Sequence, residues 1–467
     1  MHKTIEKNLF QKKNLIPLAF ILSGLYWFYL AFLTQMIITS DAIGYEQFGQ
    51  MLYQKGWLGY FQTGPNREPL YPLLISLAMR IADFFNIPYL SVQKPLQVLL
   101  LFITQLLTFK ILNKLNIGHY LKFVCLLYIG FSPSLVNSAF SLYSEIAAYP
   151  FVLALVLLAT KVWGMLPSKN KILQISFSGF GLACIFIGLI SVKAVFIGLL
   201  PIFLLPFFIL SLQAFYQRNK KTVANTLCLT LIVFFSITLF ILIFSMLNQK
   251  YNGTFAFTDR GDRIFYVAAS LRTEGITQEN LDYALRIHPH LEFSQKGENS
   301  FTKQMLALKA QGMNVNQINV EIFRLAIKQI LQNPLSYAFF YIVQGIKILF
   351  WESMRIGFVA YPEWLTKVFN CQPLEISLHI FSGVATLVAI LYTMKFIKNQ
   401  WGRFLYPPQL NETVPLLFFS LIIILPFILL HSFAIVLPRF ILPIVPLYLI
   451  LIAFSLEEIR RQIIKGQ

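Results

Sequence analysis

Ten apolar runs, each long enough to cross a lipid bilayer, constrain this chain more than any other feature of its sequence. A spanning helix needs about 20 mainly apolar residues. Charged residues make up only 12% of the 467 positions, whereas soluble domains carry about 25%, so an ordinary soluble enzyme is excluded. The runs predict an all-α polytopic membrane protein with about 10–12 transmembrane helices. They are Leu15–Ile38, Pro95–Leu112, Leu121–Phe140, Ile146–Trp163, Leu173–Ile190, Ala194–Leu212, Thr222–Leu247, Glu375–Met394, Val414–His431 and Phe440–Ser455.

Lysine and arginine residues predict how these helices are oriented. The net charge is +18, and six short segments between or beside the apolar runs are basic. Because basic loops stay in the cytoplasm, we expect ten crossings with both termini inside, and we interpret the charge as a topology signal and not as a nucleic-acid surface. The six groups are Lys3/Lys7/Lys12/Lys13, Lys110/Lys114/Lys122, Lys161/Lys169/Lys171, Arg218/Lys220/Lys221, Lys395/Lys398/Arg403 and Arg460/Arg461/Lys465.

Two shorter apolar segments, Leu70–Phe85 and Leu335–Trp351, are marginal as spans. If only one of them crossed, every basic segment beyond it would move to the outer side. We therefore expect both to be re-entrant or to lie at the outer interface.

The remaining sequence divides the chain into three regions. Residues 1–247 form a transmembrane module that includes an outer loop at 39–69, residues 248–334 form a large non-cytoplasmic loop, and residues 335–467 form a C-terminal transmembrane region. In the outer loop, apolar residues at helical spacing follow Ser40 and Asp41 and predict an amphipathic helix on the membrane surface. These apolar residues are Tyr45, Phe48, Met51 and Leu52.

A small set of ionisable residues converges on the outer interface, although its members come from separate stretches of the chain. A charge at bilayer depth costs roughly 2.5–3.5 kcal/mol, so each one needs a reason. Each also has a structural alternative. Asp41 could cap a helix together with Ser40, and Glu145 could complement a helix dipole. Lys193 and Arg439 could be snorkelling anchors, His431 could be an interfacial histidine, and Arg67 could pair with Glu68 on the surface. The set is Asp41, Arg67, Glu68, Glu145, Lys193, His431 and Arg439.

Together these residue types suit chemistry on a lipid-linked phosphate. Arg67, Arg439 and Lys193 supply cations for a phosphate at the membrane surface. Asp41 and Glu145 supply carboxylates that can take a proton from an acceptor hydroxyl. A phosphate is a good leaving group, so one base and several cations would suffice for sugar transfer.

Five short motifs, in order along the chain, resemble GT-C glycosyltransferases of the family 39-like group, which includes protein O-mannosyltransferases and aminoarabinose transferases. The resemblance implies a GT-C-like bundle in which the first region is catalytic. The motifs are Ser40-Asp41-Ala42 with Tyr45, Gly56 and Arg67-Glu68-Pro69-Leu70-Tyr71-Pro72; Leu142-Tyr143-Ser144-Glu145; Asn252-Gly253-Thr254-Phe255 with Gly261; Ile330-Leu331-Gln332-Asn333-Pro334-Leu335; and Pro438-Arg439-Phe440 with Pro443 and Pro446.

The resemblance implies a polyprenyl-phosphate sugar donor, used on the non-cytoplasmic face with inversion. It implies that Asp41 is catalytic, that the segment Arg67-Glu68 with Tyr71 approaches the substrates, and that Arg439 contacts the phosphate. Many members carry Asp-Glu at the first site, whereas here Ala42 follows Asp41. The role of the second carboxylate is therefore open to Glu46, Glu68 or Glu145. No residues have metal-ligand spacing, so we expect no required metal cofactor, although some GT-C enzymes use a divalent ion.

The leading hypothesis is thus a glycosyltransferase in the inner membrane of a prokaryote, with a glycan, lipid or protein acceptor. A glycan polymerase or ligase would use similar cations. A transporter or lipid flippase would place its polar site near the bilayer midplane, commonly between repeated halves, and the sequence has neither feature.

Overall fold

The computed structural model describes residues 15–167, 172–285, 291–354, 358–404, 412–433 and 438–466, which are almost entirely helical. Strands β1 (Gln35–Met36) and β2 (Val359–Ala360) pair antiparallel. The long bundle consists of α2 (Leu15–Leu33), α5 (Tyr89–Lys114), α6 (His119–Phe131), α7 (Pro133–Phe140), α8 (Glu145–Met165), α9 (Ile172–Val192), η1 (Ala194–Leu199), α10 (Leu200–Tyr216), α11 (Lys220–Asn252), α18 (Gln372–Phe404), α19 (Thr413–Ser432), η3 (Pro438–Ile444) and α20 (Val445–Gly466). The other helices are α3 (Asp41–Thr63), α4 (Leu70–Phe85), α12 (Arg260–Arg272), α13 (Gln278–Leu285), α14 (Leu291–Ala310), α15 (Val315–Gln332), α16 (Pro334–Lys347) and α17 (Glu363–Phe369).

Each of the ten predicted crossings coincides with a long apolar helix or with a bent helix pair. In the described ranges, nine helices are long and apolar enough to cross a membrane. The run Leu121–Phe140 is the pair α6 and α7, which meet at 43°. The bend follows from Pro133, which has no N–H to continue α6, and from Ser132, whose Oγ accepts the Leu135 amide at 3.3 Å and caps α7. The chain is therefore an all-α, multi-pass membrane protein.

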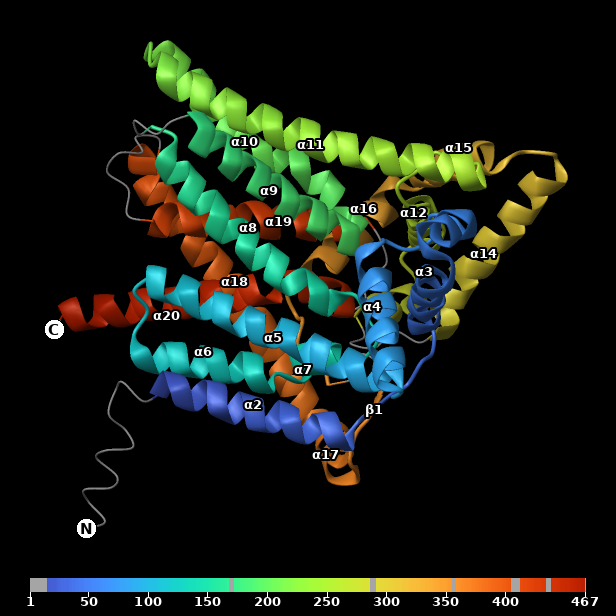
Figure 1. Ribbon diagram of the computed structural model, residues 1–467, viewed down its shortest axis with the longest axis horizontal. Coiled ribbons are helices and arrows are strands. Elements are labelled where there is room, and N and C mark those ends of the chain that lie inside the picture. The colour runs from blue at the N-terminus through green and yellow to red at the C-terminus, as the bar shows by residue number, and fades with distance from the viewer. Residues whose placement is uncertain are drawn as a thin grey trace.

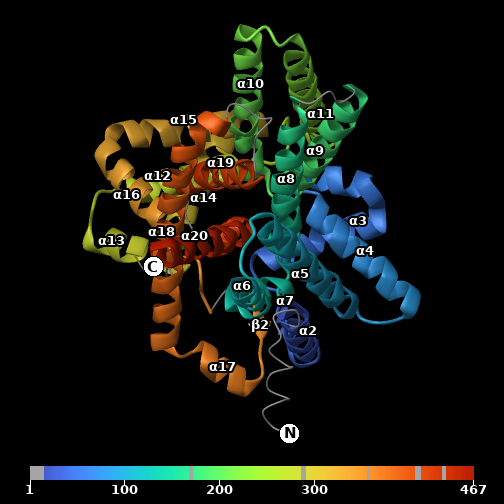
Figure 2. The same cartoon turned by 90° about the vertical axis from the view of Figure 1, so that its left-hand side faces the viewer.

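Helix α8 lies in the middle of the bundle. Figure 2 shows it between α5, α9 and α19, and it contacts all three as well as η3. Its sequence is apolar around the whole circumference, which is typical of a helix buried on every side. Its two charged residues differ in exposure: Lys161, near its C-terminal end, is exposed, whereas Glu145, its first residue, is 2% exposed. The bundle thus buries the Glu145 carboxylate at the end that we expect outside.

The basic segments that we expect in the cytoplasm belong to helix ends at one end of the bundle. Figure 1 shows the α5–α6 and α10–α11 connections, the start of α19 and the end of α20 on the left. Lys114 contacts Glu412, and Arg461 donates to the Asn116 carbonyl, so three of these segments touch. Of the predicted basic groups, Lys3, Lys7, Lys12, Lys13, Lys169 and Lys171 lie outside the described residues.

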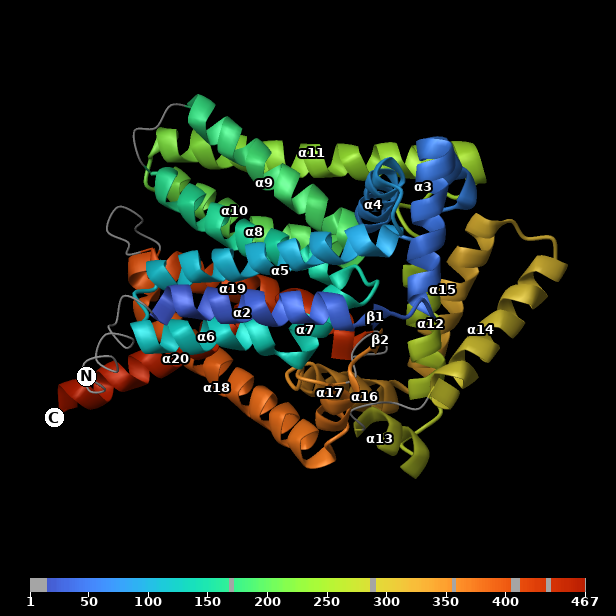
Figure 3. The same ribbon diagram turned by 60° about the horizontal axis from the view of Figure 1, so that its bottom comes forward.

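The segment predicted as the outer loop forms α3, which lies across the opposite end of the bundle beside α4 (Figures 1 and 3). The predicted helix is confirmed, and its position on the membrane surface stays a prediction, but the apolar residues that suggested it face protein. Tyr45, Phe48 and Leu52 are buried within the protein, and α3 packs on α4 and α11. Gly49 permits this approach, since a Cβ there would lie 2.5 Å from a side-chain carbon of Ile75. Helix α3 is thereby held against α4 and α11.

The two marginal segments form helices that are shorter than the spanning ones. Helix α4 has 16 residues, and α16 has 14 and ends at Lys347, before the apolar segment itself ends. Both lie at the end of the bundle that carries α3 (Figure 3). Their short length and their location at one end of the bundle agree with the predicted interfacial position, which stays a prediction.

The orientation of the bundle can be tested through a native cysteine. Cys371 is exposed between α17 and α18, at the end that we expect outside, whereas Cys125, Cys184 and Cys228 lie within apolar helices. We expect a membrane-impermeant maleimide to label intact cells at Cys371, and Cys371→Ser to abolish that labelling. Labelling only after the cells are opened would contradict the predicted orientation.

Candidate active site

Three arginines from distant parts of the chain surround the carboxylate of Asp41. Arg67 Nη2 lies 2.9 Å from Oδ1, Arg260 Nη2 lies 3.4 Å from the same oxygen, and Arg439 Nη2 contacts Oδ2. Burial alone would raise the pKa of Asp41, but the three guanidiniums outweigh burial and hold this pKa well below its usual range. In this arrangement Asp41 is ionised, and both of its oxygens are engaged.

The backbone conformation of the residue before Asp41 is unusual. The preceding residue, Ser40, has φ 53°, a left-handed conformation that is strained for a residue with a Cβ. The Ser40 side chain makes no capping bond to α3. The structural alternative, in which Asp41 and Ser40 only cap the helix, therefore does not describe this site.

Aromatic rings and a glycine hold two of the arginines in place. The guanidinium of Arg67 lies 4.7 Å from the centroid of the Tyr45 ring, and that of Arg439 lies 4.5 Å from the Tyr143 ring. A Cβ at Gly44 would lie 2.6 Å from Arg67 Nη2, so only glycine leaves room for that guanidinium. Such stacking favours arginine over lysine at both positions.

Arg260 reaches the site from the large outer loop. It is the first residue of α12, and the segment before it is attached to the α3–α4 turn. Asp259 N–H donates to the Pro65 carbonyl at 3.1 Å, and Asn252 Nδ2 donates to the Phe61 carbonyl at 2.9 Å. The 248–334 region thus contributes a cation to the same centre as the N-terminal module.

A second ion pair lies beside the first. Lys193 Nζ contacts Glu145 Oε1 at 2.9 Å, and both side chains are largely buried. Glu68 does not pair with Arg67 as a surface salt bridge would; its Oε1 accepts the Ala194 amide at 3.1 Å. Lys193 is therefore a paired residue of the site and not a snorkelling anchor.

Two predicted residues lie further from this centre. The Tyr71 hydroxyl donates to Gln97 Oε1 at 2.8 Å, and its ring packs edge-on against Tyr45. Tyr71 therefore supports the ring under Arg67. His431 stacks on Phe427, with ring centroids 4.0 Å apart, and its Nδ1 lies 3.2 Å from the Phe427 carbonyl, as expected for a structural histidine.

Four buried atoms that belong to charged side chains of the site have no hydrogen-bond partner within the described part of the chain. They are Arg67 Nη1, Arg439 Nε, Glu68 Oε2 and Glu145 Oε2. An unsatisfied buried polar group costs about 1–3 kcal/mol, so native proteins rarely retain several together. Two of these atoms are cationic donors and two are carboxylate acceptors. A ligand that carries both an anion and hydroxyl groups would satisfy all four.

Sequence reasoning missed Arg260. A charge inside an apolar run is conspicuous, but Arg260 lies in a polar loop where charges are common. Its only local signal is the neighbouring Gly261, which the resemblance included. Within the described ranges, no group of three or more His, Cys, Asp or Glu side chains is placed to hold a metal. Independence of metal remains a prediction.

No family model matches the chain, and a search of curated proteins finds no match.

The buried pair predicts a large stability difference between two lysines. Lys193→Ala would leave the Glu145 carboxylate buried and unpaired, so we expect a loss of about 3–5 kcal/mol in the free energy of unfolding. The matched control is Lys367→Ala, which breaks the exposed pair with Glu363 and should cost almost nothing. Thermal unfolding in detergent measures both. Equal losses would mean that the Lys193 pair is solvated.

Proposed function

We propose that the protein is a glycosyltransferase that moves a sugar from a polyprenyl-phosphate sugar to an acceptor hydroxyl on the non-cytoplasmic face, with inversion. The observation that carries this proposal is the set of unpartnered donors and acceptors around Asp41. Arg67 and Arg439 would bind the phosphate, while Glu68 and Glu145 would accept hydrogen bonds from hydroxyl groups of the sugar or acceptor.

The chemistry then follows from the charges. The acceptor oxygen attacks the anomeric carbon while Asp41 takes the hydroxyl proton, and the bond between that carbon and the phosphate oxygen breaks with its electrons moving to the phosphate. The arginines stabilise the negative charge that develops there. Proton removal of this kind contributes about 10²–10⁴-fold to the rate.

The arginines also impose an order on binding. While three guanidiniums surround Asp41, its oxygens have little basicity and no free approach for a hydroxyl. A phosphate competes for the same guanidiniums, because it offers them a second anion. Donor binding would thereby release Asp41 to act as the base before the acceptor arrives.

Two arrangements favour this proposal over a transporter. The charged cluster involves the first residues of α3, α8 and α12 and the turn before η1, all at one end of the bundle (Figure 1). A transporter concentrates such residues near the midplane. The resemblance adds support, since three residues it selected, Asp41, Arg67 and Arg439, meet at one centre. Because the same cations suit a polymerase or ligase, the donor must be identified directly.

The test is sugar transfer by purified protein in vesicles. Radiolabelled polyprenyl-phosphate sugars, each with a different sugar, are supplied with a membrane fraction that contains acceptors. Movement of label from lipid to acceptor would support the proposal and identify the sugar. Labelled lipid that crosses the bilayer without turnover would favour a flippase. Transfer of a preassembled glycan chain, and of no single sugar, would favour a polymerase or ligase.

A further inference from the structure

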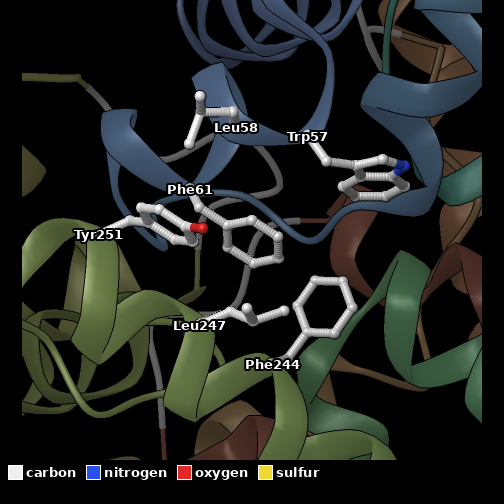
Figure 4. Close-up of a pocket in the computed structure, with 6 residues that line it drawn as sticks. All are labelled: Trp57, Leu58, Phe61, Phe244, Leu247 and Tyr251. Atoms are coloured by element: carbon white, nitrogen blue, oxygen red, sulfur yellow. The ribbon is translucent and has the colours of Figure 1, made fainter.

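An apolar groove lies between the second half of α3 and the C-terminal part of α11. It encloses about 370 Å³. Figure 4 shows the six side chains that line it, four of which are aromatic. They are Trp57, Leu58, Phe61, Phe244, Leu247 and Tyr251. None carries a charge, so the groove suits a hydrocarbon ligand.

The backbone of α3 is broken to form this groove. Gly56 has φ 64° and interrupts the helix, and Gly64, with φ 104°, ends it. Between them the chain turns toward α11, where the Phe61 and Phe244 rings lie 5.2 Å apart. Trp57 nevertheless remains 44% exposed. The fold therefore presents aromatic surface here without covering it.

Tyr60 connects the groove to the backbone of Arg67. Tyr60 packs edge-on against Trp57, with ring centroids 5.7 Å apart, and its hydroxyl donates to the Arg67 carbonyl at 2.5 Å. One residue thus contacts both the groove wall and the arginine that binds Asp41. At the other rim, Lys250 Nζ lies 5.3 Å from the centroid of the Tyr251 ring. Lys250 therefore lies at one rim of the groove, and the backbone of Arg67 is reached from the other rim through Tyr60.

We infer that this groove holds the part of a polyisoprenoid chain that lies next to the lipid phosphate. The inference rests on the proposed function and adds where the carrier lipid is bound. Three observations favour this occupant over bulk phospholipid. Tyr60 links the groove to the backbone of Arg67, four of the six lining residues are aromatic, and α11 is a predicted span that would bring the groove to the outer leaflet. The phosphate would contact the arginines while the first isoprene units lie against Trp57 and Phe61.

The test compares long-chain and short-chain ligands that share a phosphate. Binding of radiolabelled undecaprenyl phosphate and of methyl phosphate, which has no isoprene unit, is measured with purified protein in detergent. Trp57→Ala should weaken binding of the long chain roughly tenfold and leave binding of methyl phosphate unchanged. Leu247→Trp, which fills the groove instead of emptying it, should have the same selective effect. Phe235→Ala removes an exposed α11 aromatic that does not line the groove and should change neither.

Each outcome separates the groove from the proposed function. If wild-type protein binds long chains but Trp57→Ala and Leu247→Trp bind them equally well, the chain lies elsewhere and the inference is overturned while the function stands. Equal weakening of both ligands would also overturn it, because that pattern indicates damage to the phosphate site. If wild-type protein binds neither phosphate, the proposed function itself fails.

Discussion

Replacing Asp41 with asparagine should reduce sugar transfer by about 10²–10⁴-fold, the usual contribution of a general base, and should at the same time tighten binding of the lipid phosphate. The amide keeps the shape of the side chain but cannot take the acceptor proton. It also no longer competes for Arg67, Arg260 and Arg439, so the three guanidiniums become available to the phosphate. Single-turnover transfer and equilibrium binding of the donor measure the two effects separately.

The opposite signs make this result specific. A variant that is merely misfolded would lose binding and turnover together. Asp83→Asn is the matched control, because Asp83 is a carboxylate on α4, at the end of the bundle that we expect outside, and it accepts from the Tyr53 hydroxyl at 3.0 Å. It should leave both quantities unchanged. Full transfer by Asp41→Asn would show that another carboxylate removes the proton, with Glu68 and Glu145 the candidates in the site.

The spanning helices could be predicted because the hydrophobicity that identifies them is summed over many residues. A run such as Val414–His431 contains so many apolar side chains that no single substitution hides it, and it coincides with α19 to within one residue at each end. Charges near these runs were equally visible, because an apolar background makes each one costly. That contrast brought Asp41, Glu145 and Arg439 to attention before their contacts were known.

The remaining features depend on tertiary contacts that periodicity does not encode. The apolar face of α3 looked suited to lipid, but a lipid surface and an apolar protein surface select the same residues, and α4 and α11 cover it. Glu352 is similar: it is fully buried and accepts hydrogen bonds from Tyr128, Ser132 and the Ser134 amide. Its only sequence signal is a lone acid after an apolar segment, whereas its partners are more than 200 positions away.

Arg439→Ala should weaken donor binding by roughly 10–100-fold, the effect expected for loss of a charged hydrogen bond in a buried site. Arg439 is the contact to one oxygen of Asp41, and its unpartnered Nε is one of the two cationic donors that a phosphate would satisfy. Its position at the start of a predicted span also allows the alternative that it only anchors the helix. Arg263→Ala is the control, since Arg263, on α12, forms an exposed pair with Glu298 at 2.8 Å. It should leave donor binding intact.

The pH dependence of the same variant decides between these roles. Asp41 must be ionised to act as the base, so the acid limb of kcat/KM follows its pKa in the free enzyme. The three arginines lower that pKa, and activity should therefore persist to low pH in the wild type. Removing Arg439 removes one of the charges that lower the pKa, so the pKa rises and the acid limb moves to higher pH. If Arg439 only anchors the helix, its removal would reduce the amount of folded protein equally at every pH and would not move the acid limb of the profile. A reduced but unshifted profile, with expression falling in proportion, would therefore assign Arg439 to the fold and leave the phosphate to Arg67 and Arg260.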